Sequence, residues 1–416
     1  MWGRVLLRAA AATAACSLAA CGGGQTPVEG KAPYGTSSGS TTGTSGTQPQ
    51  GPPQDFEPEA IASIDMPWAL MEHFDSLADT VTLGDHLAYT YNDEEDVGVT
   101  AYRLDTGEIA WHASVQDGDS FGVMPRKHAP RMAGTAVVGA FATSKDGEGT
   151  SAGHEAIKVV ALDAATGSQL WAREFAKDDD TWAGTPRVVG ADGRRVLVSV
   201  SEEGYSEKPA MSVLLDAQTG REIWTDRDLD GIDLEKTVVV GTRDDGEFVG
   251  KSTSDGRQLW KRPMITGEAL TADPGPGLTL ANGIGAGDSL LLDPVTGKTS
   301  LDMKDGARNC RYDGWTTTLC SGTDGTGSAT VTAVDVRTAR VLWRLPDEAA
   351  NRVAPEVTSA WHGLVYAEAN GPMTLAARTG KDLRTDIGLA PSMVNDRYGL
   401  VYDPLRRITD VYRARD

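Results

Sequence analysis

The sequence contains no long apolar run, few cysteines and few bases, and each shortage excludes a class of protein. None of its 416 residues belongs to a run of 18 consecutive apolar side chains, so no membrane-spanning helix is predicted. Asp and Glu outnumber Lys and Arg by 59 to 39, which gives a formal net charge of −20. An acidic chain without a basic stripe is a poor partner for nucleic acid. The six histidines show no metal-ligand spacing and no Cys-x-x-Cys occurs, so neither a zinc site nor a thiol redox motif is supported.

The first 20 residues form a targeting segment and take no part in the fold. Arg4 and Arg8 precede an Ala-rich stretch at 9–20 that is too short to cross a bilayer. The stretch ends in Leu18-Ala-Ala-Cys21, followed by three glycines, and this resembles the lipobox of a bacterial lipoprotein signal peptide. The resemblance implies that residues 1–20 are removed and that Cys21 carries the lipid anchor, diacylglycerol and palmitate-type acyl chains. The alternative is ordinary secretory cleavage beside an incidental Cys.

Residues 21–54 read as a tether between the anchor and a folded domain at 55–416. Gly, Ser, Thr, Pro and Gln supply 28 of the 33 residues from Gly22 to Gln54. Such a composition cannot bury apolar surface, so we expect a flexible spacer. We therefore expect an extracytoplasmic protein that is lipid-anchored to the cell membrane.

Cysteine usage agrees with that location. Cys16 leaves with the signal and Cys21 is lipidated, so Cys310 and Cys320 remain. Two cysteines in an oxidising compartment predict a disulfide. Asp313-Gly314 lies between them as a hairpin turn, and pairing 310 with 320 requires a bulge or a longer loop there.

One unit repeats through the rest of the chain. The clearest copies read Val160-Ala-Leu-Asp-Ala-Ala-Thr-Gly167 to Trp171 and Leu214-Leu-Asp-Ala-Gln-Thr-Gly220 to Trp224. The glycine position recurs at 107, 167, 220, 256, 297, 339 and 380, with Ala at 339. The later spacings of 36 to 42 residues fit four short strands with tight turns, which is the period of a propeller blade.

Each position of the unit has a mechanical role. The apolar run predicts a strand, the Asp caps the following turn, and Gly adopts a left-handed conformation. The Trp then offers a large face to the neighbouring blade, as a core residue and not as a substrate site.

The two ends of the repeat region complement each other. A last copy around Tyr398–Arg413 stops before its outer strand, whereas Ile64–Trp68 resembles an outer strand without inner ones. Joining them completes a ring of eight blades, and closure removes exposed sheet edges. We therefore predict an all-β fold, an eight-bladed β-propeller of four-stranded antiparallel blades, with seven blades as the alternative.

These Asp-x-x-Thr-Gly-x-x-x-Trp units resemble the PQQ-like β-propeller repeat family. The resemblance covers nearly all of residues 60–416 and weakens where Leu301 and Arg384 replace Trp and where Ala339 replaces Gly. Dehydrogenases of that family bind a quinone beside calcium and carry adjacent cysteines, and this chain has no Cys-Cys pair. We expect no enzyme activity and no cofactor, with a quinoprotein-type oxidoreductase as the competing class. A hydrolase is disfavoured because the Gly149–Gly153 pattern lies in a polar loop.

One acidic segment could hold a cation. Asp226, Asp228, Asp230 and Asp233 alternate around Gly231, as oxygen ligands do in calcium loops. The twelfth position is Thr237 and not the usual Glu, so an acidic connection exposed to solvent is the alternative.

The chain thus reads as a monomeric, non-catalytic binding or scaffolding module whose partner is a protein or another envelope component. The family resemblance also suggests an envelope-assembly factor similar to the outer-membrane β-barrel assembly lipoprotein. Insertions at Gln116–Pro130, Thr143–Glu155, Glu202–Ala210 and Asp226–Asp233 lengthen the early blades. Strand alternation places all four on one face, which we predict to be the binding surface.

Overall fold

The computed structural model shows one folded unit built of small antiparallel sheets. The chain divides into two units, Met1–Thr47 and Gln48–Asp416, and every described residue belongs to the second. The structure describes residues 51–65, 77–92, 96–115, 121–123, 128–145, 153–176, 184–201, 210–243, 246–263, 274–282, 289–304 and 306–415. Within these ranges, no helix has the length and apolar character that spanning a membrane requires.

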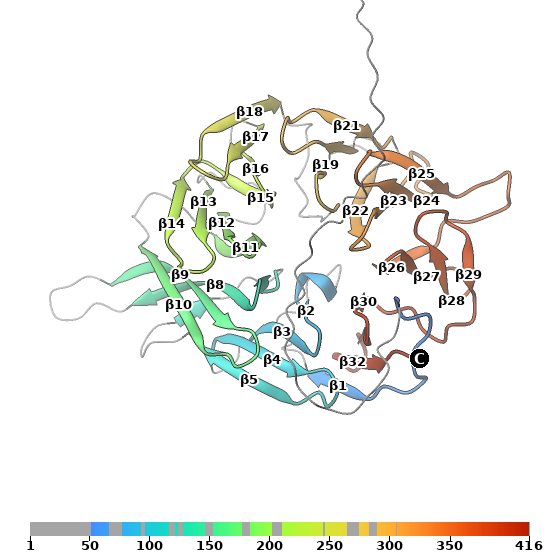
Figure 1. Cartoon of the computed structure of the whole chain (residues 1–416), viewed down its shortest axis with the longest axis horizontal. Helices are drawn as coiled ribbons and strands as arrows, with labels where there is room; N and C mark the ends of the chain where they lie inside the picture. Colours follow the sequence, from blue (N-terminus) through green and yellow to red (C-terminus); the bar gives the residue numbers. More distant parts are fainter. Residues whose placement is uncertain are drawn as a thin grey trace, which may run out of the picture. The chain divides into compact units, whose positions relative to one another are not determined.

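Eight sheets follow one another around the ring of the second unit (Figure 1). We number them as blades 1 to 8, starting from the sheet that contains β2. Seven of them have four or more strands, and three strands are described in blade 5. The predicted eight-bladed propeller is therefore confirmed, and the seven-bladed alternative is wrong.

The strands of each blade are antiparallel and mostly follow chain order from the inner to the outer edge. Blades 1 to 4 consist of β2 (Thr82–Leu83), β3 (Leu87–Asn92), β4 (Gly98–Arg103) and β5 (Ile109–Ser114); β6 (Phe121–Val123), β7 (Arg131–Ala133), β8 (Ala136–Lys145), β9 (His154–Asp163) and β10 (Gln169–Ala176); β11 (Thr185–Ala191), β12 (Arg195–Ser201), β13 (Met211–Asp216) and β14 (Glu222–Asp226); and β15 (Asp230–Leu234), β16 (Val238–Thr242), β17 (Glu247–Ser252) and β18 (Gln258–Pro263).

Blades 5 to 8 repeat the arrangement, and the described segments add one short 3₁₀ helix, η2 (Leu77–Asp79), ahead of blade 1. Their strands are β19 (Thr279–Asn282), β20 (Ser289–Leu292) and β21 (Thr299–Asp302); β22 (Ala307–Tyr312), β23 (Thr317–Thr323), β24 (Ala329–Asp335) and β25 (Arg340–Leu345); β26 (Glu356–Trp361), β27 (Leu364–Glu368), β28 (Pro372–Ala376) and β29 (Asp382–Arg384); and β30 (Met393–Val394), β31 (Tyr398–Asp403), β32 (Ile408–Arg413) and β1 (Ala62–Asp65).

The turn before the outermost strand recurs from blade 1 to blade 7. Its left-handed residue has φ between 51° and 74° at 107, 167, 220, 256, 297, 339 and 380. Ala339 adopts this conformation without being glycine, which explains how the degenerate copy keeps the turn. In blade 8, Arg407 has φ of 58° in the turn between the second and third strands, β31 and β32. The predicted cap is also present, since Asp216 Oδ1 accepts hydrogen bonds from the amide and the hydroxyl of Thr219.

Tryptophans join each of several blades to the next one. The indole Nε1 donates to a carbonyl in the turn of the following blade, over 2.7–3.1 Å: Trp111 to Ala164, Trp171 to Ala217, Trp260 to Pro294 and Trp343 to Ala377. The ring lies against the turn glycine, so a Cβ added at Gly220 would come within 2.5 Å of Trp171 Cε3. The predicted packing role of the repeat tryptophans is confirmed at these positions.

Blade 8 is built from both ends of the described chain. Strand β1 pairs with β32 in register from Ala62↔Val411 to Asp65↔Ile408, and Ile64 is buried there. The same neighbourhood fixes the segment before β1, because Tyr366 Oη donates to the Pro53 carbonyl over 2.5 Å. The predicted joining of the two ends is therefore confirmed, although Trp68 lies outside the described residues. At Gly107, the turn glycine of blade 1, an added Cβ would contact the backbone of Ser63 on β1.

Cys310 and Cys320 form a disulfide with an S–S distance of 2.07 Å. The two cysteines lie opposite each other on β22 and β23. The turn that joins these strands is longer than two residues, since the Asp313 amide donates to the Thr317 carbonyl. This is the longer loop that pairing of 310 with 320 requires.

Strand direction sorts the connections of each blade onto two faces. The connections after the second and fourth strands leave at one end, which we call the connection face, for example those that begin after Lys145 and after Asp226. The turns after the first and third strands leave at the other end, which we call the turn face, for example 313–316 and 163–167. The four predicted insertions all begin at strand ends of the connection face, as expected, although much of their length lies outside the described residues.

The segment from Asp226 to Asp233 was predicted to be a lengthened loop, and this prediction is wrong for most of its residues. Residues 227–229 alone connect blades 3 and 4, and Asp230–Leu234 is the first strand of blade 4. Gly231 and Ile232 are buried there, so pairing with β16 outweighs the polar composition of the segment. Part of Gln116–Pro130 is likewise a strand, β6, which pairs with β8 from Phe121↔Ser144 to Val123↔Ala142.

Candidate functional site

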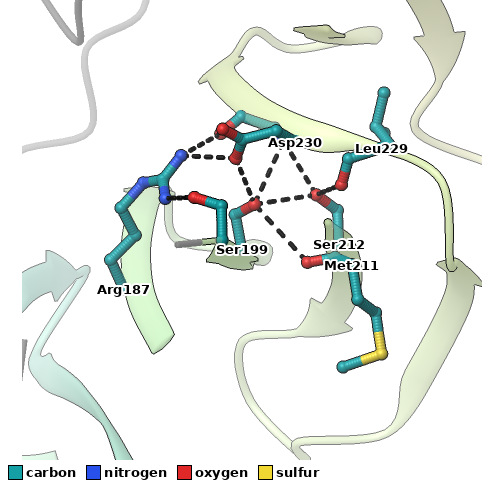
Figure 2. A network of polar contacts seen from close by, with 8 residues as sticks. Arg187, Ser199, Met211, Ser212, Leu229 and Asp230 are labelled. Carbon is teal, nitrogen blue, oxygen red and sulfur yellow. Dashed lines mark hydrogen bonds and ion pairs between the residues drawn. The ribbon is translucent and has the colours of Figure 1, made fainter. Parts of the chain in front are cut away.

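A cluster of polar side chains joins blades 3 and 4 and contains the acidic segment singled out by the sequence. It is built on strands β11, β12, β13 and β15, with further members at the end of β14 and on blade 4 (Figure 2). Its parts are an inner network around Arg187 and Asp230 and an outer cluster around Asp226.

In the inner network, one carboxylate oxygen of Asp230 accepts from two neighbours. The Arg187 guanidinium forms an ion pair with this oxygen, and Ser199 Oγ donates to it over 2.7 Å. Arg187 also donates to the hydroxyl of Ser201. Figure 2 shows these groups pointing toward one another across the seam between the blades.

Two serine hydroxyls continue this network into the sheet. Ser212 Oγ donates to the Leu229 carbonyl over 2.8 Å, and it accepts from the Gly231 amide over 2.8 Å. Ser199 and Ser212 face each other in register on β12 and β13, and both are fully buried. Every hydroxyl therefore has a partner inside the protein, which is the condition for burying polar groups at low cost.

In the outer cluster, the carboxylates meet cationic side chains. Asp226 forms ion pairs with Lys251 and, over 3.2 Å, with Arg243. The other guanidinium arm of Arg243 holds Asp228. Asp226 and Lys251 are nearly buried, with side-chain exposures of 12% and 11%.

Burial alone would raise the pKa of the Asp226 carboxyl. The hydrogen bond from Lys251, the amide of Asp228 and the charges of Lys251 and Arg243 outweigh burial and lower the pKa below its usual range. Asp226 is therefore a carboxylate at neutral pH, and it links the outer strand of blade 3 to blade 4.

The contacts of this site hold two blades together, and its serine is not placed to attack a substrate. The Ser199 hydroxyl donates to a carboxylate, as a nucleophile beside a base would, but Ser199 has no exposed surface through which a substrate could reach it. The site instead cross-links two blades with charge-assisted hydrogen bonds and fixes the base of the connection face.

The four aspartates of the predicted calcium site have other partners. Asp226 and Asp228 share Arg243, Asp230 binds Arg187, and Asp233 accepts from the hydroxyl of Thr279. In the part of the chain that the structure describes, no group of three or more His, Cys, Asp or Glu side chains is placed to hold a metal ion. Calcium binding at these residues stays a prediction, and the cationic partners compete with it for the carboxylates.

Sequence reasoning missed Arg187, Ser199 and Ser212. A signal for the serines exists in the sequence, because both interrupt apolar strands at positions that strand alternation places inside. Nothing in the sequence identifies their partners, since Arg187 and Asp230 are 43 residues apart. The predicted anchor, Cys21, lies outside the described residues.

The connection face beside this site is extended by the hairpin of β8 and β9. These strands pair over ten residues each, from Ala136↔Asp163 to Lys145↔His154, and run outward beyond their neighbours (Figure 1). Blade 3 next to it pairs its second and third strands over six residues, Arg195↔Asp216 to Val200↔Met211. The hairpin therefore projects from a ring whose blade 3–4 seam is fixed by ion pairs.

Comparison with known proteins gives one family match for this chain. A family model described as outer membrane protein assembly factor BamB matches residues 75–262 and 156–310. The chain has no match among the curated proteins compared with it.

Three solved structures are similar to this chain at low sequence identity. BamB from Moraxella catarrhalis is 16% identical with a TM-score of 0.47, over 85% of this chain and 99% of that one. The quinohemoprotein alcohol dehydrogenase ADHIIG from Pseudomonas putida HK5 is 14% identical with a TM-score of 0.46, over 86% and 76%. The computationally designed Ika8 protein is 12% identical with a TM-score of 0.37, over 78% and 98%.

Proposed function

The chain belongs to the family of the outer membrane protein assembly factor BamB, and from this premise we propose that it is a membrane-tethered, extracytoplasmic binding module for a protein partner. The family description refers to assembly of outer membrane proteins. From this description we take only the general role, a propeller that binds a protein in the cell envelope. It assigns the chain no enzymatic step.

One observation carries this proposal: the lengthened connections of blades 2 and 3 begin on the same face, next to a seam that ion pairs lock. Partner contacts concentrate on loops that a rigid scaffold positions. The scaffold here is rigid because blades 3 and 4 are cross-linked by Arg187–Asp230 and Lys251–Asp226. A rigid base lowers the ordering cost that a partner would otherwise pay on binding.

The sequence of the N-terminal region supports the tethered arrangement. Lipidation at Cys21 would fix one end of a spacer to the membrane, and the fold begins where Pro53 is bound by Tyr366. A propeller on such a spacer samples partners near the membrane at high effective concentration.

The test is affinity capture from crosslinked envelopes with the full-length protein. One variant replaces residues 146–152 and 203–209 by short Gly-Ser links. Its matched control shortens residues 324–327, a connection on the same face of blade 6. Both variants should keep the wild-type melting temperature because all three replaced segments lie between the bounds of the described strands.

We expect the first variant to lose the captured protein at least tenfold and the blade 6 control to retain it. Equal capture by both variants would contradict the proposal. So would quinone-dependent dye reduction by the purified protein, because that result identifies an oxidoreductase.

A further inference from the structure

The turn face carries a tryptophan whose position differs from that of the repeat tryptophans. Trp315 lies in the turn between β22 and β23, outside the repeat unit, and it is 55% exposed. By contrast, the repeat tryptophans Trp111, Trp171 and Trp224 are at most 9% exposed. A large apolar ring that is held in solvent costs free energy, and such exposure commonly marks a contact site.

The Trp315 ring is the end of an ordered stack. It lies parallel to the His362 ring, with centroids 4.8 Å apart and an interplanar angle of 10°. His362 stacks in turn on Trp361, at 4.0 Å and 24°. Trp315 also covers Gly363, whose added Cβ would lie 3.5 Å from the indole. One face of the indole is therefore covered, and the exposed area belongs to its edges and its opposite face.

Hydrogen bonds fix the turns that carry the stack. Asp313 Oδ1 accepts from the amides of Trp315, Thr316 and Thr317 over 2.8–2.9 Å. The His362 amide donates to the Asp313 carbonyl, which ties blade 7 to blade 6. The ring is thus held in place before any ligand arrives, so little conformational entropy is lost on binding.

Polar and charged groups surround the stack. The Asp396 carboxylate accepts from Trp361 Nε1 over 2.8 Å, lies 3.3 Å from His362 Nδ1 and is 57% exposed. Arg378 donates to the Thr316 hydroxyl over 3.2 Å, beside Trp315, and is 51% exposed. Acceptors and donors therefore flank a single flat apolar surface.

From this arrangement we propose that Trp315 is the platform of a saccharide-binding site on the turn face. A pyranose ring has an apolar face of C–H groups, which can pack on the open face of the indole. Its edge carries hydroxyls that can donate to carboxylates and accept from guanidinium groups. A protein hot spot is the less suitable occupant, because it is enclosed by further apolar contacts, whereas Asp396 and Arg378 border this stack.

The charges of the site favour the same ligand class. Asp396 faces His362, and Arg378 forms an ion pair with Asp335 over 3.0 Å. Both signs are present side by side, which suits a neutral, hydroxyl-rich ligand better than a strongly charged one. The site is independent of the partner-binding connection face and shares only the extracytoplasmic location with the proposed function.

The experiment titrates the full-length protein with tetrasaccharides of β-1,4-linked N-acetylglucosamine, β-1,4-linked glucose and α-linked mannose, followed by tryptophan fluorescence and calorimetry. Trp315→Ala removes the platform, Trp315→Phe keeps a smaller flat ring, and Leu405→Ala is the control at a fully solvated apolar side chain that is 94% exposed. Melting temperatures verify that each variant is folded.

We expect saturable binding of at least one tetrasaccharide by the wild type and by Leu405→Ala. Trp315→Ala should weaken it about tenfold or more and Trp315→Phe by a smaller factor. The proposal is overturned if no tetrasaccharide binds, or if Trp315→Ala binds as tightly as the wild type. It is also overturned if Trp315→Ala loses the captured envelope protein and not the sugar, because Trp315 would then be a protein contact. If the deletions in the connection face do not reduce protein capture, that result contradicts the proposed function and leaves the saccharide site unaffected.

Discussion

At the scale of single residues, the propeller depends on close contacts between turn glycines and tryptophan rings. Gly167, Gly220, Gly297 and Gly380 have left-handed backbones, and an added Cβ at any of them would lie 2.5–2.6 Å from an indole of the preceding blade. Two constraints thus coincide at each position, because L side chains disfavour the backbone and the ring fills the space. Each of these turns therefore requires glycine for its backbone conformation and for the space that the indole ring occupies.

Gly220→Ala should therefore destabilise the protein more than a Gly→Ala change usually does. The new methyl must displace the Trp171 ring and also adopt φ near 65°, so we expect a loss of about 3 kcal/mol in the free energy of unfolding. Urea unfolding measures it. The control is Gly193→Ala, where a Cβ meets nothing within 4 Å. A Gly220→Ala variant as stable as Gly193→Ala would refute the packing described for the turn.

Asp226 should give part of the stability a dependence on pH. Its pKa is lowered in the folded state, despite burial, by Lys251, the Asp228 amide and Arg243. A carboxyl with a depressed folded pKa stabilises the protein above its unfolded pKa of about 3.9, and that contribution is lost as the pH falls through the folded pKa.

Asp226→Asn should cost on the order of 2 kcal/mol at pH 7, because it leaves two cations without their carboxylate. The difference from the wild type should shrink as the pH falls below about 4. Urea unfolding at pH 7 and pH 3 tests this, with the exposed turn residue Asp105 replaced by Asn as the control. A difference that does not change with pH would show that Asp226 does not act through its charge.

At the scale of elements, the sequence predicts the turns from local residues but does not predict which distant strands pair. The sequence predicts the Asp216-to-Gly220 turn because each of its residues has a local mechanical reason to be there. It also predicts that Ile64 belongs to an outer strand, since the last blade lacks one. It misassigns Asp230–Leu234 as loop, because this segment pairs with β16 and Ile232 packs against Val238 and Val240, which local composition does not reveal.

The candidate site divides in the same way. The acidic residues are visible in the sequence as an unusual run, but their partners Arg187, Arg243 and Lys251 lie on other strands. Trp315 was not singled out from the sequence, although it lies outside the repeat unit. Its stacking on His362 depends on how blades 6 and 7 meet, which no local pattern encodes.

The disulfide within blade 6 is an element-scale prediction. It links β22 to β23 across a ten-residue separation, and both cysteines are buried. Replacing Cys310 and Cys320 together by Ser should lower the free energy of unfolding by about 2–3 kcal/mol, mainly because the unfolded chain gains freedom. Urea unfolding with and without dithiothreitol measures it, and reduced wild type should approach the variant. Two reactive thiols in the native, unreduced protein would contradict the bridge.

At the scale of the whole molecule, the proposal joins a lipid anchor to a closed ring. If Cys21 carries the lipid, as the resemblance to a lipobox implies, Cys21→Ser should release the protein from the membrane fraction by tenfold or more. Fractionation of cells with immunoblotting measures this, and the melting temperature of the released protein should match the wild type. A variant that stays as firmly in the membrane fraction as the wild type would show that anchoring does not depend on this residue.

The most direct test of the central claim, that the connection face of blades 2 to 4 binds a protein partner, is site-specific photo-crosslinking in intact cells. A photoreactive residue replaces Glu155, which is exposed on the β8–β9 hairpin, and in separate strains it replaces Leu405 or Val295, which are exposed on blades 8 and 5. We predict one discrete protein adduct from position 155 and none from the other two. The same adducts from all three positions, or none from position 155, would contradict the account.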